Sequence, residues 1–157
     1  MLNKMFKRAL VLFALVWCVP AFAAGSHMVV KQVKGSFEDV RDALVFAING
    51  QGLVVNAVSH VGDMLDRTGR DLGYTTKVYE HAEGLEFCSA ALSRKMMEAD
   101  PDNIVFCPYT IYIYVRADQP GTVYLAYRRP LADKGMQTPV LQDVETLYQT
   151  ILSEAAQ

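Results

Sequence analysis

The sequence lacks the short motifs that mark the common enzyme and cofactor sites. It contains no glycine-rich phosphate loop, no Ser-His-Asp order and no His-x-x-x-His pair. The Cys-x-x-Cys motif is absent, and so is the Cys-x-x-Cys-His motif that attaches haem covalently. The carboxylates are spread along the chain as they are on solvated surfaces. We therefore expect a protein without enzymatic activity, and no motif identifies a cofactor.

A hydrophobic run long enough to span a membrane is also missing. The apolar run at residues 9–19 is short for a membrane-spanning helix, which needs about 20 residues. It follows Lys4, Lys7 and Arg8 and precedes a small-x-small pattern, which together are typical of a secretory signal. We predict that residues 1–24 are a signal peptide, that the protein is periplasmic or secreted, and that no membrane span remains after cleavage. The alternative is an uncleaved N-terminal anchor.

Positive charge is scarce in the sequence that follows the predicted signal peptide. The signal carries three of the 15 Lys and Arg residues and none of the 17 Asp and Glu residues, which leaves 12 cations against 17 anions, a net charge of −5. The cations are dispersed among acids and form no stripe that could follow a phosphate backbone. We therefore expect no nucleic-acid partner. Residues 25–28, Gly-Ser-His-Met, match the remnant of a cleaved tag and equally fit native sequence.

What is present is a regular succession of strand and helix patterns over residues 29–157, which we expect to form a single globular domain. The predicted class is α+β, a mostly antiparallel sheet with helices packed on it, in the order β-α-β-α-β-α-β-β-α. The strands are expected at residues 29–33, 53–58, 77–87 with an interruption at 82–84, 104–115 and 123–127, and the helices at residues 37–48, 61–72, 89–99 and around 144–152.

Two predicted elements contain residues that disturb regular structure. Pro108 cannot donate to a ladder, so it is expected at a bulge or at the true start of its strand. From Tyr109 onward, Ile111 and Ile113 alternate with polar or aromatic residues, which predicts one buried and one open face. Gly69 lies inside a predicted helix at a cost of about 1 kcal/mol, which a close approach of a neighbouring strand would explain.

Several short segments follow one another in the order of the predicted elements. They are Ser36-Phe37-Glu38-Asp39-Val40 with Leu44, Gly52-Leu53, residues 64–73, Glu98-Ala99-Asp100-Pro101, Cys107-Pro108 and residues 123–130. With these segments, residues 29–130 resemble the domain of unknown function 302 family. The resemblance implies a compact domain with an antiparallel sheet, often dimeric, with no agreed activity and no catalytic residue.

The remaining part has only two cysteines, Cys88 and Cys107, because Cys18 falls within the signal. In an oxidising compartment such a pair favours a disulfide. A second hypothesis is a reactive thiol pair that carries a sulfur species, since Cys88 precedes a helix start, where a thiolate is favoured. A third is a soft-metal, copper-like site built from both cysteines with Met96 and His81.

Aromatic residues of the last two strands form a candidate ligand face, with a cation at its end. The members are Tyr109, Tyr112, Tyr114, Tyr124 and Arg128. Packing or a dimer interface would use the same residues.

We therefore expect an exported, non-enzymatic domain that binds a small ligand or a partner and is braced by a Cys88–Cys107 disulfide. The alternatives are a thiol or soft-metal protein that uses the same cysteines, and a purely structural homodimer.

Overall fold

The computed structural model describes residues 27–132 and 136–157. The predicted signal peptide lies outside the described residues, as do Gly25 and Ser26. Within the described ranges, no helix is long and apolar enough to cross a membrane. The elements are β1 (Met28–Val33), α1 (Phe37–Gly50), β2 (Val55–Ser59), α2 (Val61–Asp71), β3 (Tyr79–Phe87), α3 (Ala90–Ala99), the 3₁₀ helix η1 (Pro101–Phe106), β4 (Tyr109–Arg116), β5 (Val123–Arg128) and α4 (Pro139–Glu154).

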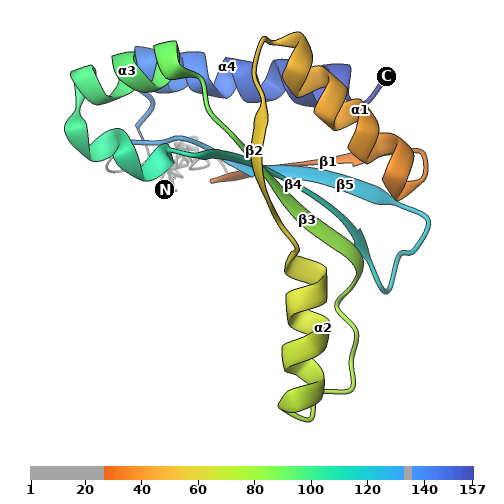
Figure 1. Ribbon diagram of the computed structural model, residues 1–157. Helices are drawn as coiled ribbons and strands as arrows, with labels where there is room; N and C mark the ends of the chain where they lie inside the picture. Colours follow the sequence, from red (N-terminus) through yellow and green to blue (C-terminus); the bar gives the residue numbers. More distant parts are fainter. Residues whose placement is uncertain (1–26, 133–135) are drawn as a thin grey trace, which may run out of the picture.

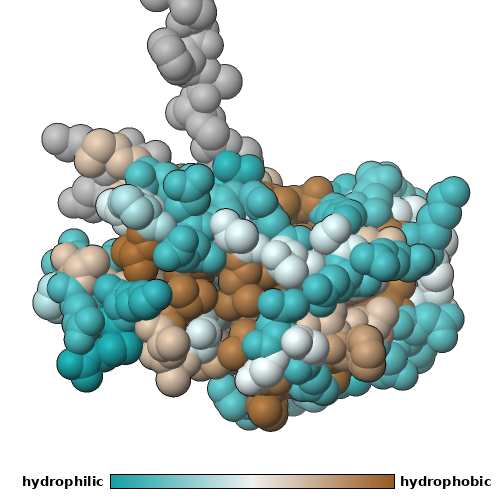
Figure 2. Space-filling model, turned by 90° about the horizontal axis from the view of Figure 1, so that it is seen from above, coloured by the Kyte–Doolittle hydropathy of each residue, from teal (hydrophilic) through white to brown (hydrophobic). Residues whose placement is uncertain are grey.

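The five strands form one sheet in the order β1-β5-β4-β3-β2, and every neighbouring pair is antiparallel. Figure 1 shows α1, α3 and α4 together along one side of the sheet, whereas α2 extends away on the other side and contacts β3. The predicted α+β class and element order are confirmed. Seen from above, the helix layer presents mainly hydrophilic residues, with hydrophobic residues visible between them (Figure 2).

The core lies between the sheet and these three helices, and the alternation of β4 determines it. Tyr109, Ile111 and Ile113 are fully buried, while Tyr112 on the opposite face is 43% exposed. The helices contribute Val40, Leu44 and Ile48 from α1 and Leu141, Val144 and Ile151 from α4. Each fully buried aliphatic side chain stabilises the fold by about 1.5–3 kcal/mol.

Residues 104–106 differ from the prediction, because they belong to η1 and not to a strand. The side chain of Asp100 accepts a hydrogen bond from the amide of Asp102 at 3.0 Å, and Pro101 occupies the first position. These capping interactions start a helical turn and override the β-branched composition of Ile104 and Val105. Strand β4 begins at Tyr109, directly after Pro108. Of the two positions expected for Pro108, a bulge or the true start of the strand, the structure agrees with the second.

Strand β3 is also continuous, without the interruption predicted around Gly84. Gly84 pairs with Tyr112 of β4, and a Cβ at Gly84 would lie 3.0 Å from the Tyr112 ring. The glycine therefore makes room for the aromatic ring of its cross-strand partner. A glycine in a strand often marks such an approach, and here it does not end the strand.

In α2, the close approach predicted at Gly69 occurs at Gly62. A Cβ at Gly62 would lie 3.0 Å from the backbone nitrogen of Ala82 in β3, whereas a Cβ at Gly69 would meet nothing nearer than Tyr74 Cβ at 3.9 Å. Gly62 thus allows α2 to begin directly against β3. Gly69 has no such packing role.

A group of aromatic rings fills the core where α4 crosses the sheet. Tyr148 of α4 stacks on Tyr127, with ring centroids 4.5 Å apart, and meets Tyr109 and Phe87 edge to face at 5.9 and 6.0 Å. Burial raises the pKa of Tyr109, Tyr127 and Tyr148 above the usual value for tyrosine. All three hydroxyls therefore keep their protons at neutral pH.

The two glycines of α2 should respond to alanine in opposite directions. We expect Gly62→Ala to lower the free energy of unfolding by about 1–3 kcal/mol, because α2 or β3 must shift. Gly69→Ala should raise it by about 0.5–1 kcal/mol, because alanine has the higher helix propensity and meets no clash. Urea unfolding of both variants measures the difference. Equal effects would contradict the placement of α2 on β3.

The buried tyrosines should make the fold sensitive to alkali. Their raised pKa values mean that the unfolded chain loses its phenolic protons first, so stability is fully present below about pH 10 and falls as the pH rises further. Urea unfolding between neutral and strongly alkaline pH tests this, with Tyr148→Phe expected to show a shallower decline. Stability unchanged at a pH where the native protein already shows phenolate absorbance for these residues would contradict it.

Candidate functional site

The two cysteines lie side by side at the ends of neighbouring elements. Cys88 directly follows β3, Cys107 directly follows η1, and their sulfur atoms are 3.1 Å apart. Both are free thiols and are half-buried. A disulfide bond measures about 2.05 Å, so the structure describes an unbonded pair. The disulfide therefore stays a prediction, now with its two partners adjacent.

A hydroxyl group connects the thiols to the core. Ser93, in the first turn of α3, has its Oγ 3.3 Å from Cys88 Sγ and 3.7 Å from Cys107 Sγ, and donates a hydrogen bond to the Tyr109 hydroxyl at 3.2 Å. Burial, followed by the contact with Cys88, raises the pKa of the Cys107 thiol. The Cys107 thiol therefore keeps its proton at neutral pH.

Of the other two residues of the hypothetical metal site, His81 lies far from the thiols along the strand. His81 lies seven positions before Cys88 along β3, which corresponds to roughly 20 Å of strand, and it stacks on Phe37 with ring centroids 4.8 Å apart. Met96 is fully buried in the core. Across residues 27–132 and 136–157, no group of three or more His, Cys, Asp or Glu side chains is placed to hold a metal ion.

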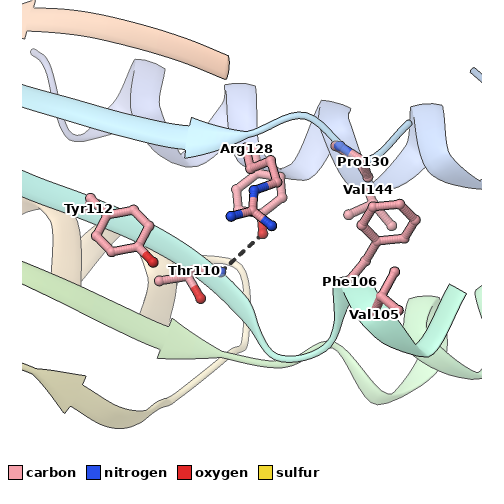
Figure 3. Close-up of a pocket in the computed structure, with 8 residues that line it drawn as sticks. Val105, Phe106, Thr110, Tyr112, Arg128, Pro130 and Val144 are labelled. Carbon is pink, nitrogen blue, oxygen red and sulfur yellow. Dashed lines mark hydrogen bonds between the residues drawn. The ribbon is translucent and has the colours of Figure 1, made fainter. Parts of the chain in front are cut away.

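A pocket of about 130 Å³ opens where β4 and β5 separate. Its lining has two halves. Figure 3 shows Thr110, Tyr112 and Arg128 on one side, and the apolar side chains of Val105, Phe106, Pro130 and Val144 on the other. Tyr148 completes the lining from α4. The pocket is therefore polar at one end and apolar at the other, the usual character of a small-molecule site.

The separation of the strands has a specific cause. The β4–β5 ladder ends at the pair Tyr112–Ala126, so Thr110 and Arg128, which would face each other two positions further along, are not joined. The amide N–H of Thr110 donates instead to the hydroxyl oxygen of Tyr148, at 3.0 Å. Tyr148 thus reaches from the helix layer into the gap between two strands and satisfies a donor that the ladder leaves unpaired.

The predicted ligand face divides into separate parts. Tyr112 and Arg128 line the pocket, whereas Tyr109 is fully buried beneath the helices and belongs to the core. Tyr114 stacks on Tyr124, with ring centroids 5.1 Å apart, and Tyr124 is only 2% exposed. These two tyrosines pack against each other on the open side of the sheet and do not line the pocket.

Sequence reasoning missed Thr110, Tyr148 and Ser93 as site residues. Tyr148 falls within the last predicted helix, around residues 144–152, and its ring is buried on the core side of α4. A phenolic hydroxyl in an apolar stripe needs a hydrogen-bond partner when it is buried, and this requirement was the available signal. The partner itself is a backbone amide, which sequence alone does not identify.

Comparison with known proteins connects this geometry to one family. The family model described as "Domain of unknown function DUF302" matches residues 29–156. The chain is similar to the crystal structure of an uncharacterized conserved protein DUF302 from Bacillus stearothermophilus, at 16% identity and a TM-score of 0.67, over 84% of this chain and 99% of that chain. At this identity, the likeness concerns the fold. No curated protein matches the chain. The match to the family model over most of its length shows that the chain belongs to the DUF302 family.

Proposed function

We propose that this protein is an exported, non-enzymatic domain that binds a small ligand in the pocket between β4 and β5 and is braced beside it by a Cys88–Cys107 disulfide. The observation that carries the proposal is the two-sided lining of the pocket, with Tyr112 and Arg128 at its polar end. Export is supported by the signal-like pattern of residues 1–24 and by the placement of two cysteines where an oxidising compartment would join them.

The proposed brace would act directly on the pocket. Cys107 follows Phe106, which lines the apolar half, and a bond to Cys88 would tie this wall to the end of β3. Forming the bond removes one proton and one electron from each thiol, and a disulfide donor of the compartment accepts them. The sulfurs need to approach by about 1 Å to reach bonding distance.

The second candidate function uses the same thiols as a reactive pair. Two free thiols 3.1 Å apart, half-buried beside the Ser93 hydroxyl, are also arranged to carry a sulfur species or to hold a soft metal such as copper(I) between two sulfurs. In this case the two cysteines would stay reduced, or would alternate between the thiol and disulfide forms, and would not be joined permanently.

The oxidation state of Cys88 and Cys107 in the purified protein distinguishes these two candidate functions. Protein exported to the periplasm, purified and alkylated without reductant should carry no alkyl group, and reductant should expose two thiols. The oxidised form should be about 3 kcal/mol more stable than the reduced form, because the bond closes a loop between positions 19 apart. Cys88→Ser should take up one alkyl group under both conditions. Two alkyl groups on the native protein before reduction would show that the disulfide does not form, and would favour the reactive thiol pair.

Ligand binding can be tested with small fragments of known charge. Benzene-sized neutral, cationic and anionic fragments should be titrated into methyl-labelled protein and followed by NMR. At least one charge class should shift the methyl signals of Val105 and Val144, which line the pocket, and leave those of Val123, buried elsewhere in the core, unchanged. If no class shifts the pocket signals, the proposed binding function is wrong.

A further inference from the structure

We propose that the pocket between β4 and β5 takes a small organic anion, a carboxylate attached to a compact apolar group. This inference rests on the proposed binding function and specifies the ligand class. It follows from the hydrogen-bonding groups at the polar end, from the charges around them and from the size of the apolar end.

Arg128 provides an available positive charge. Among residues 27–132 and 136–157, no carboxylate forms an ion pair with its guanidinium, and its side chain is exposed at the mouth of the pocket. The adjacent Arg129 differs, because its Nε lies 3.4 Å from a carboxylate oxygen of the buried Glu145. A guanidinium presents several N–H donors in a plane that matches a carboxylate. Of the two neighbouring arginines, Arg128 is therefore the one left for a ligand.

Three hydroxyl groups stand beside this charge with their protons uncommitted. Tyr148 accepts a hydrogen bond from the Thr110 amide, so its oxygen is engaged while its O–H can still donate. Burial raises the pKa of Tyr148, which keeps that proton in place. Within the described part of the chain, the Thr110 and Tyr112 hydroxyls also have no side-chain or backbone acceptor. The polar end thus offers donors from four side chains.

No acidic group competes with an anion at this position. The eight lining residues include no Asp or Glu. The carboxylate that faces the site from the neighbouring strand belongs to Glu86, which pairs with Thr110 in the β3–β4 register. Glu86 accepts a hydrogen bond from Ser59 of β2 at 3.1 Å, on the side away from β4. A cation would find no partner in the lining, whereas an anion would find one charge and several donors.

The apolar end limits the rest of the ligand. Val105, Phe106, Pro130 and Val144 surround a space that forms part of a pocket of about 130 Å³. Apolar cavities of about 150 Å³ admit benzene, so the whole pocket has room for one compact group, a phenyl ring or a short branched chain, with its carboxylate at the polar end. A long acyl chain or a nucleotide does not fit in it. The ligand class is therefore a compact aromatic or short aliphatic carboxylate.

The test compares benzoate with benzamide, its neutral equivalent of nearly the same shape, by calorimetric and NMR titration of the mature protein at neutral pH. Benzoate should bind more tightly than benzamide, and acetate should bind more weakly than benzoate because it leaves the apolar end empty. Arg128→Gln should weaken benzoate binding by about 10- to 100-fold and leave benzamide unchanged, as expected for the loss of a charge-assisted hydrogen bond. Tyr148→Phe should weaken benzoate to a smaller extent.

Arg116→Gln is the matched control, because Arg116 lies on the same open side of the sheet but over the Tyr124 ring, 4.6 Å from its centroid, and outside the pocket lining. It should bind benzoate as the unmodified protein does. Equal binding of benzoate and benzamide, or an equal loss in Arg128→Gln and Arg116→Gln, would overturn the anion assignment. If only neutral or cationic fragments shift the Val105 and Val144 signals, the anion assignment fails while the binding function stands; if no fragment shifts them, both fail.

Discussion

The hydrogen bond from the Thr110 amide to the Tyr148 hydroxyl is the interaction on which the site depends. In a complete antiparallel ladder, Thr110 would be joined to the facing residue of β5, Arg128, but the β4–β5 pairing ends two residue pairs earlier, at Tyr112 and Ala126. A buried amide without an acceptor costs about 1–3 kcal/mol. Tyr148 supplies the acceptor from the helix layer, so the two strands can separate without that cost. The space between them is the pocket.

The same short stretch of chain also connects the pocket to the thiols. Within residues 106–110, Phe106 lines the pocket, Cys107 lies beside Cys88, and Tyr109 receives the hydrogen bond from Ser93. The stretch begins at the end of η1 and continues into β4, the central strand of the sheet. Formation of a disulfide at Cys107 would therefore affect the residue directly next to Phe106 in the pocket wall. In the same way, a ligand that contacts Phe106 would lie one residue along the chain from Cys107.

Much of the fold could be predicted because the patterns that specify it are local. The alternation of Ile111 and Ile113 with open-side residues predicts the correct faces of β4. The first predicted helix, at residues 37–48, corresponds to α1, where the hydroxyl of Ser36 caps the helix by accepting from the Asp39 amide at 3.1 Å. The errors arose where a local cap or a cross-strand neighbour determined the outcome. Asp100 turned an apolar β-branched run into a 3₁₀ helix.

The site was less predictable, because its geometry depends on contacts between distant positions. The two cysteines were identified from composition, and the structure brings them together. Tyr109 was placed on the ligand face although its position in the alternation puts it with the buried residues, as the structure shows. Tyr148 contributes through a hydroxyl that meets a backbone amide 38 positions away. Patterns of apolar spacing record which ring is buried, but they carry no information about which amide a ladder leaves unpaired.

Hydrogen exchange of a single amide tests the central claim most directly. In the unmodified protein, the Thr110 amide should exchange slowly, as ladder amides of the same strand do, because Tyr148 accepts its hydrogen bond. In Tyr148→Phe, the Thr110 amide should exchange much faster, while the Tyr114 amide, which points toward β5 as the Thr110 amide does and lies within the intact β4–β5 ladder, should keep its protection. Fast exchange at Thr110 in the unmodified protein, or equal protection in both proteins, would contradict the account.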